Sequence, residues 1–154
     1  MKIELKNIKY MASMSEETAC FQASVYVDGK KEGDVSNRGT GGADDIYPRA
    51  LEDQLDAYAA TLPHEDISDF YHDGQTHTSP RTAESVIGQL LDDYLTAKEN
   101  KRLCKNKTVY RLPSHTYKKG EYHVSNSPFT PKAREMLDKK YGPGVFILNE
   151  SLTA

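Results

Sequence analysis

A glycine-rich polar loop, residues 37–42, carries the residue types in this sequence that are best suited to binding a small anion. It reads Asn-Arg-Gly-Thr-Gly-Gly and follows a stretch with the pattern of a β-hairpin. Glycine permits positive φ and a close approach of a ligand to main-chain N–H groups, and a guanidinium can pair with a phosphate. The loop matches neither a P-loop nor a dinucleotide-binding fingerprint, and a plain connecting loop is the alternative. The ligand-binding residues predicted here are Asn37, Arg38, Gly39, Gly41 and Gly42.

A second candidate set interleaves aromatic and basic side chains in the carboxyl-terminal half. Stacking on phenol rings, combined with phosphate pairing, holds nucleotides without catalysis. On a strand, successive side chains face opposite ways, so only part of the set can converge on one ligand. Solvated strand residues are the alternative interpretation. The residues of this set are Tyr110, Arg111, Tyr117, Lys118 and Lys119.

Residues 63–80 are rich in histidine and carboxylate, which are metal-ligand types. His72 and His77 are five positions apart, whereas two imidazoles that bind one ion from a helix face are four apart. We therefore predict no metal site and no cofactor. Because no serine or cysteine stands in a recognisable nucleophile context, we also predict that the protein is not an enzyme.

Composition predicts one globular domain over residues 1–154, with 37% hydrophobic and 28% charged residues. No apolar run approaches the ~20 residues that a membrane span needs, so no membrane partner is expected. The sequence shows no secretory leader and no CxxC pair. We therefore expect a cytoplasmic protein in which Cys20 and Cys104 are free thiols.

Charge is distributed unevenly along the chain. Residues 1–77 hold 7 Lys/Arg and 15 Asp/Glu, whereas residues 98–140 hold 12 Lys/Arg and 4 Asp/Glu. A basic segment of this density attracts phosphate-bearing ligands or nucleic acid through its long-range field. The alternative is that acidic and basic segments complement each other within the fold or across an oligomer.

Alternating apolar and polar residues predict three strands at the amino end. The pattern covers residues 3–10 and 21–27, and a return strand passes through Val35. Period-two alternation is typical of half-buried strands, and Asp28-Gly29 is a strong signal for a two-residue hairpin turn. Together they predict an antiparallel meander that ends in the glycine-rich loop.

Apolar residues at helical spacing predict two main helices, over residues 48–62 and 80–102. A short third helix is expected after Thr130, which is a good N-cap, with Met136 and Leu137 facing inward. Strands are expected at 108–112 and 145–148, and a hairpin or a bulged strand pair about Gly120 is expected over 117–124. The predicted fold class is α+β, in which a largely antiparallel sheet, made of the amino-terminal three-stranded meander plus carboxyl-terminal strands, is covered by two main helices and one short helix.

The segment 15–42 resembles a group of small bacteriophage and prophage proteins. The shared pattern is Ser-Glu-Glu-Thr, then Asp-Gly-Lys-Lys, then Ser-Asn-x-Gly-x-Gly-Gly, and the ending Lys-Tyr-Gly-x-Gly-Val-x-Ile-Leu-Asn at 140–149 is similar too. These motifs cover roughly a third of the chain. Phage proteins of this size include counter-defence factors, among them the anti-Thoeris sponges that bind cyclic ADP-ribose signals as oligomers. Where the group has His or Asn after the last glycine, this sequence has Ala-Asp-Asp at 43–45.

The resemblance implies a non-catalytic counter-defence protein of immune evasion, acting in the cytoplasm of the host cell. Its expected partner is a cyclic nucleotide or ADP-ribose-type signal, which it would sequester as a sponge, or a host defence protein, which it would mask by protein–protein interaction. A homo-oligomer is also expected. The alternative function is nucleic-acid binding through the basic segment 98–140.

Overall fold

The computed structural model describes residues 1–153, and the chain forms two compact units, residues 1–92 and the residues from 93 onward. The prediction of one domain over residues 1–154 stays a prediction, whereas the predicted α+β class with a largely antiparallel sheet is confirmed. Within residues 1–153, no helix is long and apolar enough to cross a membrane.

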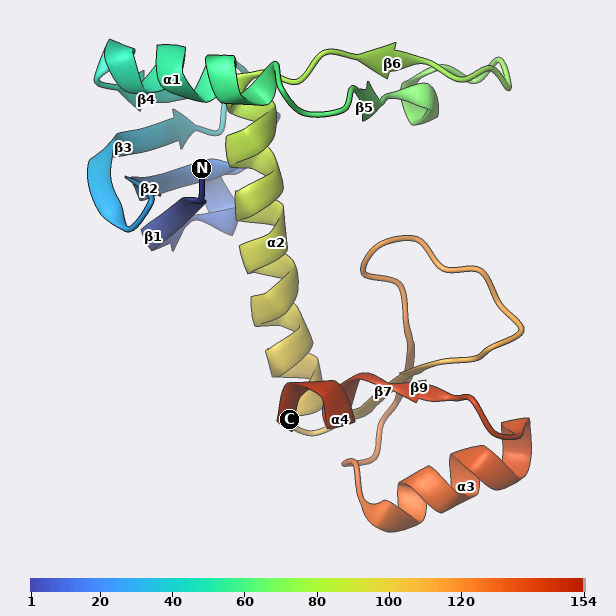
Figure 1. Cartoon of the computed structure of the whole chain (residues 1–154). Helices are drawn as coiled ribbons and strands as arrows, with labels where there is room; N and C mark the ends of the chain where they lie inside the picture. The colour runs from blue at the N-terminus through green and yellow to red at the C-terminus, as the bar shows by residue number, and fades with distance from the viewer. Residues whose placement is uncertain (154) are drawn as a thin grey trace. The chain divides into compact units, whose positions relative to one another are not determined.

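The first unit is built on a four-stranded antiparallel sheet (Figure 1). Its strands follow chain order: β1 (Ile3–Tyr10), β2 (Cys20–Val27), β3 (Lys30–Arg38) and β4 (Asp45–Tyr47). The predicted meander is confirmed, and the hairpin turn has positive φ at both Asp28 and Gly29, as this turn requires. The fourth strand was not predicted, because three residues are too few to show an alternating pattern.

Helix α1 (Arg49–Ala59) packs an apolar stripe against this sheet. The helical spacing of Leu51, Leu55 and Ala59 places all three in the core, together with Val25 and Val35 from the sheet. The helix begins and ends close to the predicted bounds. Its burial supplies much of the stability of the unit, since each large aliphatic side chain contributes about 1.5–3 kcal/mol when buried.

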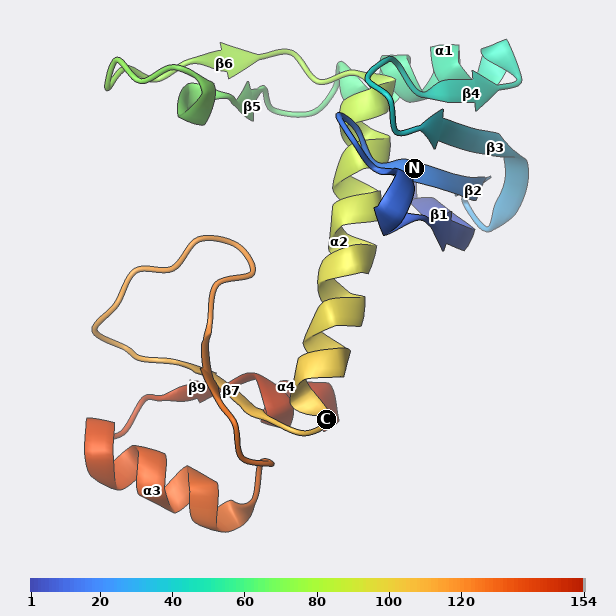
Figure 2. The ribbon, with the colours of Figure 1, turned by 180° about the vertical axis from the view of Figure 1, so that it is seen from behind.

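The connection after α1 forms an extended arm, which we define as residues 63–80. It contains a two-stranded antiparallel ladder of β5 (Glu65–Asp66) and β6 (Thr78–Ser79), with a 3-10 turn at Ser68–Phe70. In both views the arm projects away from the four-stranded sheet (Figures 1 and 2). Neither strand is long enough to show an alternating pattern in the sequence.

The long helix α2 (Ala83–Cys104) contains the boundary between the units, and the second unit continues with a three-stranded antiparallel sheet of order β8-β7-β9. The predicted second helix is confirmed, with Val86, Ile87 and Leu91 buried on one face. The other elements of the second unit are β7 (Thr108–Arg111), β8 (His123–Ser125), α3 (Pro131–Tyr141), β9 (Phe146–Ile147) and α4 (Leu148–Thr153).

Three local predictions in this half are corrected. Residues 117–124 form neither a hairpin nor a bulged strand pair, because β8 pairs with β7 instead. The residues between β7 and β8 form a loop that is fixed by hydrogen bonds of the Arg111 and Tyr117 side chains to main-chain groups. The Met136 side chain is 63% exposed rather than inward, since α3 buries no residue fully. The last strand is only Phe146–Ile147, because α4 begins at Leu148. The Thr130 cap is confirmed by the Ala133 N–H, which donates to Thr130 Oγ1 at 3.2 Å.

Candidate ligand-binding site

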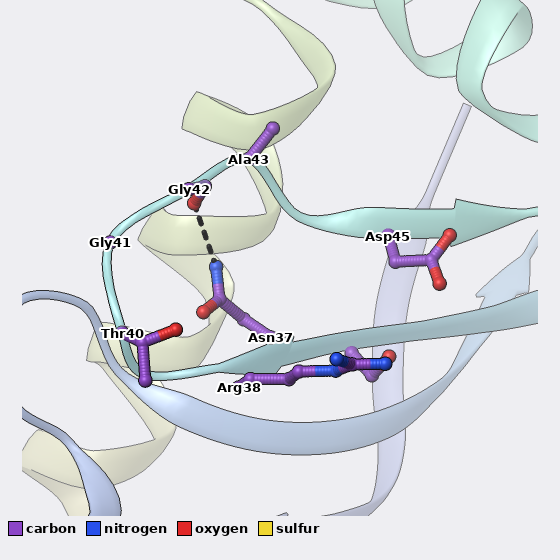
Figure 3. Close-up of a pocket in the computed structure, with 8 residues that line it drawn as sticks. Asn37, Arg38, Thr40, Gly41, Gly42, Ala43 and Asp45 are labelled. Carbon is purple, nitrogen blue, oxygen red and sulfur yellow. Dashed lines mark hydrogen bonds between the residues drawn. The ribbon is translucent and has the colours of Figure 1, made fainter.

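A polar pocket of about 320 Å³ lies at the loop that joins β3 to β4 (Figure 3). Four of the five residues predicted from the glycine-rich loop line it: Asn37, Arg38, Gly41 and Gly42. The fifth, Gly39, is buried and does not line the pocket. The structure adds further polar lining residues that sequence analysis did not select, Ser36, Thr40 and Asp45.

The Asn37 side chain organises this loop. Its Oδ1 accepts from the Gly39 N–H at 2.9 Å and from Thr18 Oγ1 at 2.8 Å. Its Nδ2 donates to the Gly42 carbonyl at 3.1 Å (Figure 3) and also to Asp44 Oδ1 at 2.9 Å. An amide group with four partners has little capacity left for a ligand. Asn37 therefore shapes the pocket, and its predicted role as a direct ligand-binding residue stays a prediction.

Gly39 anchors the loop to the preceding connection. Its carbonyl accepts from the N–H groups of Glu16 and Glu17 at 2.9 and 3.0 Å. Its φ is +82°, and a Cβ added there would meet the Met14 carbonyl oxygen and lie 2.8 Å from Cys20 Cβ. Only glycine therefore fits at this position.

Arg38 is the cation of the pocket. Its side chain is exposed, and it makes no hydrogen bond or ion pair through its guanidinium with any residue in the described range 1–153. Figure 3 shows the Arg38 and Asp45 side chains on the same side of the pocket. A guanidinium binds phosphate oxygens, while a carboxylate accepts hydrogen bonds from hydroxyls such as those of a ribose. Arg38 and Asp45 together suit a ligand that carries both phosphate and hydroxyl groups.

Asp44 is half-buried beside the pocket, and its environment disfavours the charged form. Burial raises the pKa of the Asp44 carboxyl above its usual value, the hydrogen bond from Asn37 opposes this, and the Glu84 carboxylate raises it further. The Asp44 N–H donates to Glu84 Oε1 at 2.8 Å, which fixes the two carboxylates near each other. Asp44 therefore tethers the loop to the first turn of α2 within the first unit.

The raised pKa of Asp44 predicts that Asp44→Asn increases the free energy of unfolding in a pH-dependent way. The folded state holds the Asp44 proton more tightly than the unfolded chain, so this group favours folding at low pH and disfavours it as the pH rises through the raised pKa. We expect Asp44→Asn to be more stable than the wild type at neutral pH. The gain should vanish below the ordinary value of 3.8. Urea unfolding across this pH range measures it, with Asp45→Asn, an exposed neighbour, expected to change little.

The second predicted set lies in the second unit, where several of its groups already have partners. Arg111 Nε donates to the Glu121 carbonyl at 2.9 Å, and Arg111 Nη2 donates to the Lys118 carbonyl at 3.3 Å. The Arg111 guanidinium also lies 4.2 Å from the centre of the Tyr122 ring. Arg111 therefore holds the loop between β7 and β8 in place rather than presenting its full fork to a phosphate.

Three of the four remaining members of this set, Tyr110, Tyr117 and Lys119, have side chains that contact neighbouring residues. The Tyr117 hydroxyl accepts from the Leu112 N–H at 2.9 Å, and Lys119 Nζ lies 2.6 Å from Asp93 Oδ1. Tyr110 stacks on His123 with ring centres 5.5 Å apart. Burial raises the pKa of the Tyr110 hydroxyl, and its hydrogen bond with Tyr141 adds to this. The role of these residues in ligand or nucleic-acid binding stays a prediction.

The two predicted sets thus belong to different compact units. Within residues 1–153, no group of three or more His, Cys, Asp or Glu is arranged to hold a metal ion, and the arm instead pairs His77 Nε2 with Asp73 Oδ2 at 2.9 Å. Cys20 and Cys104 are both free thiols. Comparisons with protein-family models, with curated proteins and with solved structures find no match for this chain.

The sequence gives only weak indications that the three additional lining residues belong to a pocket. Ser36 directly precedes the loop, and Thr40 lies inside it between glycines. Asp45 gave an ambiguous signal, because a carboxylate beside an anion-binding loop would repel its ligand. The position of Asp45 at the start of β4 places it on the pocket wall, and an unpredicted strand could not have indicated this.

Proposed function

We propose that this protein is a non-catalytic binding protein that holds a nucleotide-derived signal in the pocket between β3 and β4. In a phage, such a protein would act in the host cytoplasm and blunt a defence by sequestering its signal. The proposal takes the ligand to be a cyclic nucleotide or an ADP-ribose derivative, which has both phosphates and ribose hydroxyls.

One observation carries the proposal. The exposed Arg38 guanidinium shares a polar pocket with the Asp45 carboxylate and the Thr40 hydroxyl, and it has no ion-pair partner among the described residues. Most other arginines of the described chain have partners, as Arg49 does with Glu52 at 3.1 Å. A cation left unpaired inside a pocket, beside hydrogen-bonding groups and a glycine-rich main chain, supports recognition of an anionic ligand.

The shape of the loop also supports binding. Asn37 and Gly39 fix the loop before any ligand arrives, so little conformational freedom remains to be lost on binding. The pocket is lined by a cation, a carboxylate and a hydroxyl, which are groups that hold a ligand by hydrogen bonds and charge. This arrangement favours storage of a ligand.

Isothermal titration calorimetry with ADP-ribose and with a cyclic dinucleotide tests the proposal. We expect one of them to bind, and Arg38→Ala to weaken its affinity by about 10- to 100-fold, because a hydrogen bond to a charged group contributes about 1.5–3 kcal/mol. Arg49→Ala is the matched control, since it removes an exposed cation of the same unit that does not line the pocket.

Two results would count against this function. If neither compound binds tighter than about millimolar, which corresponds to only ~4 kcal/mol, the pocket is not a signal site. If Arg38→Ala and Arg49→Ala weaken binding equally, the ligand responds to the overall charge of the unit rather than to the pocket.

A further inference from the structure

The tip of the arm exposes two aromatic side chains to solvent. Phe70 is 82% exposed and Tyr71 is 49% exposed. Burial of an aromatic ring is strongly favourable, so these two neighbouring exposed rings can gain free energy by docking against a partner. The pocket proposed above does not use either residue.

Hydrogen bonds hold the arm tip in this shape. The Ser68 N–H donates to Asp66 Oδ1 at 2.9 Å, and the His77 N–H donates to Ser68 Oγ at 2.9 Å. The ring of Tyr71 stacks on that of His77 with centres 4.1 Å apart. The tip is therefore pre-organised, and Phe70 is presented outward by a fixed turn.

The arm is also acidic. Residues 63–80 contain four carboxylates, at Glu65, Asp66, Asp69 and Asp73, and no lysine or arginine. Asp69 immediately precedes Phe70 and is exposed. A partner surface that fits this tip must offer an apolar recess for one ring and cations around it.

The second unit contains a cavity with these properties, which we call the α2-end cavity. It has a volume of about 320 Å³ and lies at the carboxyl end of α2. Pro128, Phe129 and Leu152 give it apolar walls, and Lys101 and Lys105 lie on its rim. Both lysines are exposed. The Cys104 thiol also lines the cavity, where burial raises its pKa and keeps it in the neutral form.

We propose that Phe70 of one copy of this chain inserts into the α2-end cavity of a second copy. The exposed ring fills the apolar recess, while the exposed carboxylate of the neighbouring Asp69 faces Lys101 and Lys105. We assign a second copy of this chain as the partner because the acidic arm and the basic cavity rim are complementary in charge and both belong to this sequence. The contact is independent of the pocket at Arg38 and supplies a physical basis for a homo-oligomer.

Cross-linking between two different copies tests this contact. One copy carries His72→Cys, an exposed position two residues from the intact Phe70, together with Cys104→Ser. The other copy is the wild-type chain with a tag that changes its size. A short bis-maleimide joins two thiols by adding each across one maleimide double bond. We expect a product that joins residue 72 of the first copy to Cys104 of the second, identified by mass spectrometry. Cys20 is buried in both copies.

The matched control replaces His72→Cys with Met136→Cys, on an exposed side chain of α3. The proposal is overturned if both variants cross-link to the same extent. It is also overturned if a chain with His72→Cys and native Cys104 is joined only within itself, because the occupant would then not be a second copy.

Sedimentation equilibrium of the full chain gives a second, independent test. We expect Phe70→Ala to weaken self-association on the order of tenfold or more, since the ring loses its burial. Asp69→Lys should weaken it through repulsion, and Lys105→Glu in the other copy should restore it. Monomeric wild-type protein at all concentrations, or no rescue by the charge exchange, would contradict the proposal.

Discussion

Gly39→Ala is expected to lower the free energy of unfolding by about 3 kcal/mol. A non-glycine residue in the left-handed region costs about 1–2 kcal/mol, and overpacking adds about 1–3 kcal/mol. Both apply here, because φ is +82° and the new Cβ would meet the Met14 carbonyl oxygen and Cys20 Cβ. Urea denaturation of the full chain, followed by circular dichroism, measures the change.

Gly29→Ala is the matched control for this prediction. Its φ of +85° is nearly the same, but nothing lies within 4 Å of an added Cβ. We therefore expect a loss of only about 1–2 kcal/mol from backbone strain. Equal losses for the two variants would show that the close approach of Gly39 to the 14–20 segment contributes nothing. Loss of loop shape in Gly39→Ala should also abolish the ligand binding proposed for the pocket.

Asn149→Ala should destabilise the second unit by about 3 kcal/mol. The side chain is 5% exposed, and it bonds to three main-chain groups: Oδ1 accepts from the Val109 N–H at 2.8 Å, and Nδ2 donates to the Cys104 and Lys107 carbonyls at 3.2 and 2.8 Å. Each buried main-chain group left without a partner costs about 1–3 kcal/mol. The same urea experiment measures this loss.

Asn126→Ala is the control variant, because it removes the side-chain amide of an exposed asparagine in the same unit without leaving buried main-chain groups unpaired. It should change the unfolding free energy by less than about 0.5 kcal/mol, as is typical of surface positions. A comparably small effect for Asn149→Ala would contradict its role as the link between the end of α2, β7 and α4. Because Asn149 also lines the α2-end cavity, Asn149→Ala should in addition disturb the proposed contact between copies.

The glycine-rich loop shows how far sequence analysis could define a site. The residue types at 37–42 indicated an anion-binding loop. Glycines let a ligand approach main-chain N–H groups and an arginine can pair with a phosphate, and both properties can be recognised in the sequence alone. The division of roles within the loop was not predictable. Asn37 acts through four hydrogen bonds, two of them to residues Thr18 and Asp44 outside the loop, and no local pattern encodes such a pairing.

The same limit applies to the second set and to the arm. Tyr110, Arg111 and Tyr117 were selected for their chemistry, but a side chain that could bind a ligand can equally bind its own main chain, as Arg111 does. The exposure of Phe70 could not be inferred either, since an aromatic residue in a polar connection more often packs against the body of the protein.

The sequence by itself determined the local elements and the α+β class. The alternation of Ala23, Val25 and Val27, the Asp28-Gly29 turn and the helical stripe of Leu51 and Leu55 each act within a few residues, so they are visible in the chain order. Only the tertiary structure decided which of the chemically suitable side chains stay available. The Arg38 guanidinium has no partner among the described residues of its pocket, whereas the Arg111 guanidinium is hydrogen-bonded to the main chain. This difference could not be predicted, because it depends on how the folded chain surrounds each side chain.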